Sequence, residues 1–264
     1  MPFTEAFSES VAAHPLYTWT VLGVVVAGIV AFFVLSFISA PYGRHLREGW
    51  GPTMNATVLW IVMEAPSPLS FAIVYFMSDN AFKPVPLILL GMYMVHYLYR
   101  SFIYPFRMRG GHKRKPILTG GLAIAFNIAN GSTNAFAITE LSPHLLSTAW
   151  LADPRFLVGA LVFAAGYAIN HQSDAILRNL RKPGESGYKI PHGGFYRWVS
   201  SPNYFGELIE WTGFALAAWT VPAAVFVFFT AANLVPRAFS NHRWYLEHFS
   251  DYPKDRRALI PYLL

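Results

Sequence analysis

The sequence predicts an all-α fold, a polytopic bundle of transmembrane helices, and three observations lead to this prediction. Hydrophobic residues make up 54% of the 264 residues and charged residues only 13%, which is about half the charged share of a soluble domain. Apolar runs long enough to cross a hydrocarbon core of about 30 Å recur along the chain. Lysines and arginines lie in short segments between these runs, a pattern typical of membrane topology.

Seven of these runs are predicted to span the membrane. The first run carries no charge. The last two meet near Thr220-Val221-Pro222, where proline favours a tight hairpin. Six spans is the alternative, because the last two boundaries are the least defined. The predicted spans are residues 17–39, 54–76, 85–104, 118–139 and 156–176, followed by two runs within 204–229, the second extending to about residue 235.

The distribution of charge predicts the orientation. With the N-terminus outside, every lysine and arginine except Lys83 and Arg155 lies in or beside an inner loop or in the C-terminal tail. The positive-inside rule therefore favours seven spans with the C-terminus in the cytosol, and an even number would break the pattern at one end. Because the loops are short, residues 1–264 are expected to form a single domain.

Several classes of function are excluded. The net charge of +6 follows the membrane topology pattern, so nucleic acid is not an expected partner. The absence of cysteine excludes disulfides, thiolate metal sites and a cysteine nucleophile. No H-E-x-x-H motif is present, so no metal site is predicted. Gly110-Gly111 and Gly120-Gly121 do not form a Rossmann fingerprint, so any nucleotide site must be built within the helical bundle.

Ionisable and polar residues recur inside the predicted spans, where each is costly and demands an explanation. Glu64 lies in the second span. The third span carries Tyr93, His96, Tyr97 and Arg100 on one helical face. Later spans carry further sets at helical spacing. These are Asn170, His171, Asp174 and Arg178 in the fifth, Asn203, Glu207 and Glu210 in the sixth, and Arg237, His242, Arg243 and Tyr245 after the seventh.

These faces predict a shared polar interior near the cytosolic side. The alternative is that the groups only pair with one another and hold the bundle together. The inner loop after the fifth span adds cations suited to the phosphates of a dinucleotide, although ordinary positive-inside charge also accounts for some of them. These cations are Arg178, Arg181, Lys182 and Lys189.

The C-terminal half resembles the steroid 5α-reductases. The similar segments, in order, are residues 180–185, 188–191, 193–195, 199–211, 237–239, 242–245, 251–254 and 257–261. They cover most of residues 165–264, and this region carries most of the motifs that the family uses to bind its cofactor. Glu64, Val95-His96-Tyr97 and residues 100–104 also fit the family pattern, whereas the first 50 residues match only at 42–45.

The resemblance implies a seven-helix membrane reductase that binds NADPH from the cytosolic side and transfers hydride to the β-carbon of an enone such as a 3-oxo-Δ4-steroid. The ketone-contacting positions of the family fall on Glu64 and Tyr97. The family's cofactor positions fall on Asn170, Asp174, Arg181, Tyr188, Asn203, Glu207, Arg237 and Tyr245. Lys189 stands where the family has an arginine, and Asn241 where it has a histidine; both are expected cofactor contacts. From its position one turn after Tyr97, Arg100 is expected either to bind the cofactor or to make the Tyr97 hydroxyl a stronger acid.

The residue types agree with this chemistry. Hydride addition builds negative charge on the carbonyl oxygen, so hydrogen-bond donors must be aimed there. Tyr97 can donate, and Glu64 can donate when burial keeps it protonated. The nicotinamide supplies the hydride and the protein supplies position and electrostatics. No donor is identified for the proton that the α-carbon receives.

Three other functions are compatible with parts of this pattern. The first is reduction of a trans-2-enoyl-CoA or a polyprenol within the same superfamily. The second is an isoprenylcysteine-type membrane methyltransferase, which would need no enone-oxygen donors such as Glu64 and Tyr97. The third is a transporter. The expected partners are a small apolar lipid substrate and membrane lipids, with no obligate protein partner evident. Short loops and the absence of a terminal retrieval motif favour a bacterial inner membrane over the endoplasmic reticulum.

Overall fold

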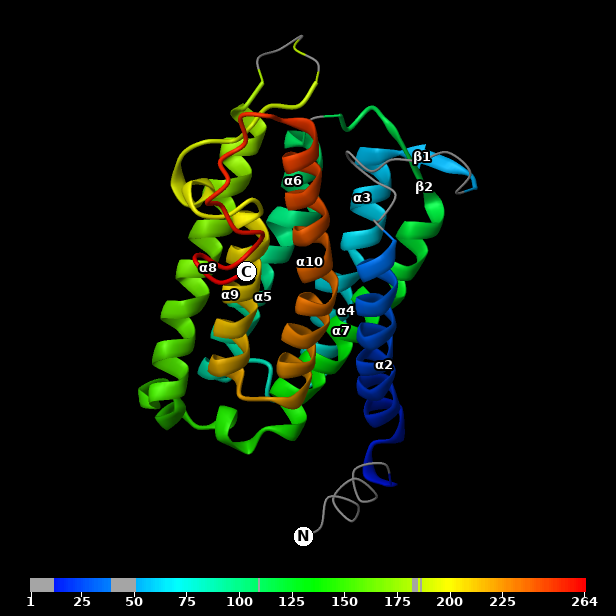
Figure 1. Ribbon diagram of the computed structural model, residues 1–264. Helices are drawn as coiled ribbons and strands as arrows, with labels where there is room; N and C mark the ends of the chain where they lie inside the picture. Colours follow the sequence, from blue (N-terminus) through cyan, green and yellow to red (C-terminus); the bar gives the residue numbers. More distant parts are fainter. Residues whose placement is uncertain (1–11, 39–50, 109, 182–184, 186) are drawn as a thin grey trace.

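The computed structural model describes residues 12–38, 51–108, 110–181, 185 and 187–264. Within them, long helices run side by side, with α8 at one flank and α2 at the other, and one short strand pair lies at one end (Figure 1). The predicted all-α class is confirmed. The segment 42–45 and Lys182, both named from the sequence, lie outside the described residues.

The described helices account for all seven predicted runs. They are α2 (Pro15–Phe37), α3 (Ala56–Glu64), α4 (Pro66–Phe76), α5 (Pro84–Leu98), α6 (Tyr104–Arg107), α7 (Ile117–Phe136), α8 (Pro154–Asn179), α9 (Pro202–Ala218) and α10 (Val221–His248). Shorter turns join them. The π-helical turns are Tyr99–Ile103 and Ala137–Leu141, and the 3-10 turns are Pro143–Leu146, Thr148–Ala152 and Gly194–Arg197.

Three helical stretches of the described chain are long and apolar enough to cross a membrane: Pro15–Phe37, Ala56–Phe76 and Val221–His248. Of the remaining helices, α5, α6 and α9 have at most 17 residues, and α7 and α8 carry polar residues on their buried faces. The protein is therefore an integral membrane protein, while the number of seven spans stays a prediction.

Two helix boundaries differ from the predicted runs. The second run is broken into α3 and α4 at Ala65, because Pro66 has no N–H to continue the hydrogen-bond ladder. The last run continues as helix to His248 rather than ending near residue 235. Hydropathy marks only the apolar part of a helix, and α10 extends into the polar region beyond it.

The short strands β1 (Thr53–Asn55) and β2 (Arg114–Pro116) pair antiparallel, with Met54 opposite Lys115. Neither strand was expected, because three residues are too few to show an alternating pattern. The pair joins the chain before α3 to the chain before α7. The Asn55 side chain then caps α3 by accepting the backbone N–H of Thr57 at 3.0 Å.

Glycines allow α8 and α9 to pack closely. Gly159 and Gly166 on α8 face Gly213 and Gly206 on α9, and a Cβ at any of the four would overlap backbone atoms of the other helix. Small residues are the usual means by which membrane helices approach. The close approach brings the polar residues of these two helices together.

The buried core is largely aromatic. Tyr93 stacks on Phe71 with ring centroids 4.2 Å apart and contacts Trp211 and Phe214 on α9. Helix α2 lies outside this core and packs against α10 and α7. Most of its large apolar side chains are exposed, as expected for a surface that faces lipid.

Candidate active site

A cavity of about 760 Å³ lies between α2, α3, α5, α7, α9 and α10, a volume within the range of small-molecule sites. Most of its wall is apolar. Helix α2 contributes Gly23, Ala27 and Ala31 at helical spacing, and aromatic rings from α7 and α10 face them. The polar lining residues include Glu64, His96, Tyr97, Arg100, Glu207 and Arg237. The cavity can therefore hold an apolar molecule with a polar group among these side chains.

Breaks in helical geometry position Glu64 and Arg100. Glu64 is the last residue of α3, and Arg100 lies in the π-helical turn that follows α5, a feature frequent at functional sites. The Arg100 Nε lies 3.9 Å from the Glu64 Oε1. Trp60 donates its indole N–H to the Arg100 carbonyl at 3.1 Å, and its ring centroid lies 4.9 Å from the guanidinium carbon. The guanidinium is thus held between an acid and an aromatic face.

Tyr97 is held by the aromatic core. Its ring stacks on Tyr93 at 4.7 Å between centroids and lies 5.6 Å from Trp211. The Tyr93 hydroxyl in turn is 2.6 Å from the Ser67 hydroxyl and accepts the Asn130 amide N–H at 3.1 Å. Packing and hydrogen bonds behind a functional side chain lock its rotamer, so Tyr97 is presented to the cavity in one orientation.

His96 and Glu210 form a buried pair beside Tyr97. The His96 Nδ1 lies 2.8 Å from the Glu210 Oε1, and the Glu210 side chain is fully buried. The second Glu210 oxygen has no hydrogen-bond partner within the described part of the chain. The sequence analysis placed both residues on polar faces but assigned neither a site role.

A second polar group joins α8 to α9. The Asn203 amide donates to the Asp174 carboxylate at 3.2 Å, and the Asn170 amide donates to the Asn203 carbonyl at 2.9 Å. Asp174 and Glu207 both act electrostatically on Arg100. The structure therefore gathers three predicted carboxylates, those of Glu64, Asp174 and Glu207, around one guanidinium.

Three other predicted cofactor residues lie in the loop between α8 and α9, outside the cavity. Arg181 donates to the Gly187 carbonyl at 2.8 Å, and its guanidinium carbon lies 5.7 Å from the Tyr188 ring centroid. The Lys189 ammonium pairs with the Glu185 carboxylate at 2.5 Å. These contacts are exposed, so the loop presents its cations to solvent.

Two predicted residues of α10 also lie away from the cavity. The Asn241 amide donates to the Ser201 hydroxyl at 3.5 Å. Tyr245 is buried and stacks on Tyr252 of the C-terminal tail, with centroids 5.0 Å apart. The structure thus divides the predicted set between the cavity, the α8–α9 interface and the surrounding loop and tail.

Sequence reasoning missed several polar residues at the site. Asn127 on α7 donates to the Met63 carbonyl and lines the cavity. Asn233 on α10 also lines it, and its buried side-chain oxygen has no hydrogen-bond partner in the described residues. The helical spacing of Thr230, Asn233 and Arg237 was the available signal for α10.

Lys115 in β2 is a further cation near the site that was not predicted. Its ammonium lies 5.1 Å from the Trp60 ring centroid. Burial lowers the pKa of Lys115, and the nearby Arg100 guanidinium acts in the same direction. The strand pair therefore contributes to the electrostatics at this end of the cavity.

Fold and site together define a helical membrane protein with a largely apolar cavity whose lining includes an acid, a tyrosine and an arginine. Residues 113–264 match the family model described as 3-oxo-5-alpha-steroid 4-dehydrogenase. Curated relatives agree. The chain is 46% identical to the Macaca fascicularis protein named 3-oxo-5-alpha-steroid 4-dehydrogenase 1, with 84% of each chain covered. It is 37% identical to the steroid 5-alpha-reductase DET2 of Arabidopsis thaliana, with 97% of this chain and 99% of the relative covered.

The chain belongs to the 3-oxo-5-alpha-steroid 4-dehydrogenase family, the steroid 5α-reductases, and is an oxidoreductase of that family. The resemblance inferred from the motifs of residues 165–264 is confirmed and extends over most of the chain.

Proposed function

We propose that this protein reduces the C4–C5 double bond of 3-oxo-Δ4-steroids, with NADPH as the hydride donor. One observation carries the proposal: Glu64 and Tyr97, from different helices, line the same largely apolar cavity. A steroid is a flat apolar molecule with a ketone at one end. The apolar wall matches its rings, and the two side chains supply partners for the ketone oxygen.

The proposed roles of Glu64 and Tyr97 follow from the negative charge that develops on the carbonyl oxygen during the reaction. Hydride arrival at the β-carbon moves negative charge to the carbonyl oxygen, forming an enolate. The Tyr97 hydroxyl and a protonated Glu64 each donate a hydrogen bond to this oxygen. Arg100, 3.9 Å from Glu64, adds positive charge close to the donors. A dry cavity strengthens all three interactions.

The residues present fit a dihydronicotinamide, which supplies the hydride when bound. A nicotinamide carboxamide carries N–H donors, and the unpaired buried oxygen of Asn233 lines the cavity as an acceptor. The Glu207 carboxylate and the Arg237 guanidinium line the same space. We assign these three side chains, with Arg100, to the nicotinamide end. We assign Asn170, Asp174 and Asn203 to supporting it from the α8–α9 interface.

The nucleotide end is assigned to the residues outside the cavity. Arg181 and the exposed Lys189 supply cations for phosphates, which arginine and lysine both bind. Tyr188 is 43% exposed, and its ring lies 4.9 Å from the Trp244 ring, measured between centroids. Asn241 and Tyr245 lie on α10 beyond the cavity. Each of these roles is a proposal taken from the family pattern.

We further propose seven spans, with the N-terminus outside and the nucleotide end in the cytosol. The support is that the loop after α6, the end of α8 and the end of α10 lie at the same end of the bundle (Figure 1). Together with the loop that follows α8 and the tail that follows α10, these segments carry most of the lysines and arginines. A bacterial inner membrane, rather than the endoplasmic reticulum, stays a prediction from the short loops.

Turnover of a 3-oxo-Δ4-steroid by purified protein in detergent tests the function, with NADPH compared to NADH. The variants are Glu64→Gln and Tyr97→Phe. Matched controls are Glu140→Gln and Tyr262→Phe, which remove the same groups at exposed positions. Loss of one oxyanion donor costs on the order of 10²–10³ in kcat. We expect losses of this size in both site variants and unchanged rates in both controls.

Each alternative outcome of this assay rejects a particular part of the proposal. NADPH binding without steroid reduction would retain the enone-reductase class and reject the substrate in favour of an enoyl-CoA or polyprenol. No NADPH binding would reject the reductase mechanism and favour the methyltransferase. Full activity in Glu64→Gln or Tyr97→Phe would remove that residue from the catalytic site.

A further inference from the structure

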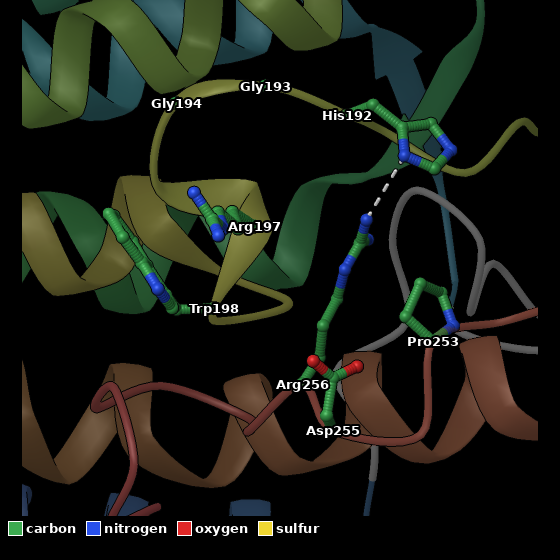
Figure 2. Close-up of a pocket in the computed structure, with 8 residues that line it drawn as sticks. All are labelled: His192, Gly193, Gly194, Arg197, Trp198, Pro253, Asp255 and Arg256. Atoms are coloured by element: carbon green, nitrogen blue, oxygen red, sulfur yellow. Dashed lines mark hydrogen bonds between the residues drawn. The ribbon is translucent and has the colours of Figure 1, made fainter.

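A second cleft, of about 530 Å³, lies between the loop 192–198 and the C-terminal tail at residues 253–256 (Figure 2). It shares no lining residue with the active-site cavity. Backbone hydrogen bonds fix its two walls against each other. Arg257 donates to the Trp198 carbonyl at 2.9 Å, and Ser200 donates to the Arg257 carbonyl at 2.8 Å. The cleft is therefore a preformed feature of the fold.

Arg256 is a buried cation in this cleft. Its side chain points from the tail toward His192, and the residue is only 3% exposed (Figure 2). Its Nη2 lies 3.3 Å from the His192 Nδ1, and its guanidinium carbon lies 5.1 Å from the Tyr252 ring centroid. These contacts orient the guanidinium without neutralising it.

The charge of Arg256 is not balanced by a carboxylate. No ion pair joins it to an acid within the described residues, although the neighbouring Asp255 lines the same cleft. Its Nε and Nη1 also have no hydrogen-bond partner there. Burying a guanidinium without a counter-ion and with unused donors is costly. A bound anion would balance the charge of Arg256 and accept hydrogen bonds from these N–H groups.

The remaining lining residues favour the same kind of ligand. Arg197 and His192 are exposed and line the cleft, and the two guanidinium groups of Arg197 and Arg256 outnumber its one carboxylate. Gly193 adopts a φ of 89°, which favours glycine. No atoms lie near the place of a Cβ there, so the rim is open. Trp198 forms an aromatic side of the cleft.

We propose that this cleft binds a phosphate group, with Arg256 and Arg197 contacting its oxygens and His192 as a further donor. Planar guanidinium groups match phosphate oxygens in pairs. His192 accepts from Arg256 through Nδ1, so a neutral ring carries its proton on Nε2. The same chemistry recognises the headgroup of a phospholipid and a soluble phosphate. The site is independent of the proposed reductase function.

The test uses the full-length protein in a phosphate-free detergent, without cofactor. The two probes are inorganic pyrophosphate, followed by calorimetry, and short-chain phosphatidylglycerol, followed by native mass spectrometry. The variants are Arg256→Gln and the exposed Arg197→Gln. Arg257→Gln is the matched control, because it removes the adjacent positive charge outside the cleft. Thermal unfolding of each variant reports whether it folds.

We expect saturable binding of at least one probe, and the tighter probe identifies the source of the phosphate. A charge-assisted hydrogen bond corresponds to roughly tenfold or more in affinity. Kd should rise by about that factor in Arg256→Gln and severalfold in Arg197→Gln, and stay unchanged in Arg257→Gln. If Arg256→Gln fails to fold, Arg197→Gln against Arg257→Gln decides the question.

Three results would overturn the proposal. The first is no saturable binding of either probe, and the second is an equal loss of probe affinity in Arg257→Gln and in the cleft variants. The third is displacement of the probe by NADPH at a concentration that just saturates the reductase site. The last result would make the cleft part of the cofactor site. Because binding is measured without turnover, failure of this proposal leaves the steroid reductase test unaffected.

Discussion

At the scale of single residues, the buried pair of His96 and Glu210 shows how the site is supported. Glu210 has no exposed surface, and its Oε1 lies 2.8 Å from the His96 Nδ1. The His96 ring lies 4.6 Å from Trp211 and 5.1 Å from Tyr97, measured between centroids. The pair therefore orients a ring that packs directly on the proposed catalytic tyrosine.

Removing the acceptor for His96 should destabilise the protein. Glu210→Ala leaves a buried ring nitrogen without its partner, which costs about 1–3 kcal/mol. Glu210→Gln keeps an acceptor oxygen and should lose less. Unfolding in detergent measures both, with Glu247→Ala on the exposed face of α10 as the control. Equal losses in the Ala and Gln variants would show that the hydrogen bond does not contribute.

Residue type and helical spacing predicted part of the site. Glu64 and Tyr97 stood out because an acid inside an apolar run needs a reason, and the structure places both on one cavity. Asn127 and Asn233 did not stand out, since an amide in a membrane helix is common. Their position on the cavity depends on which face of α7 and α10 turns inward, a matter of packing.

At the scale of elements, the glycines of α8 and α9 set the distance between two helices that carry site residues. Gly166 packs against the backbone of Glu210, and Gly206 packs against that of Asn170. The contact therefore joins the α8–α9 polar group to the buried His96–Glu210 pair.

A methyl group at this contact should separate the helices. In Gly166→Ala the new Cβ would overlap the Glu210 backbone, and overpacking of this kind costs about 1–3 kcal/mol or more. We expect a lower unfolding temperature in detergent and weaker cofactor binding. The control is Gly91→Ala on α5, an exposed position with no atoms near the new methyl. A Gly166→Ala variant as stable as the Gly91→Ala control would contradict the close packing.

At the scale of the whole molecule, the charged loops gather at one end of the bundle. The strand pair β1–β2 ties two of these loops together, and the C-terminal tail runs back along α8 and α9 (Figure 1). The polar lining of the cavity comes mainly from α3, α5, the π-helical turn that follows α5, α7, α9 and α10. The arrangement places a predominantly apolar cavity next to a polar, cation-rich end.

The predicted topology can be tested directly, because the chain contains no cysteine. Single variants Lys83→Cys, Arg155→Cys, Lys113→Cys and Arg257→Cys would be labelled with a membrane-impermeant maleimide in sealed vesicles. We expect the first two to react from the outer side and the last two from the cytosolic side. Labelling of Arg257→Cys from the same side as Lys83→Cys would indicate an even number of spans.

The sequence by itself determined the membrane class, the family and the approximate positions of the helices, and it predicted Glu64 and Tyr97 as the residues most suited to enone chemistry. These follow from composition, apolar run length and motifs, all of which are local along the chain. Tertiary structure alone decided the π-helical turn at Arg100, the β1–β2 pair, the His96–Glu210 contact and the cleft at Arg256. Each depends on groups far apart in sequence, or on local backbone geometry that apolar run length does not record.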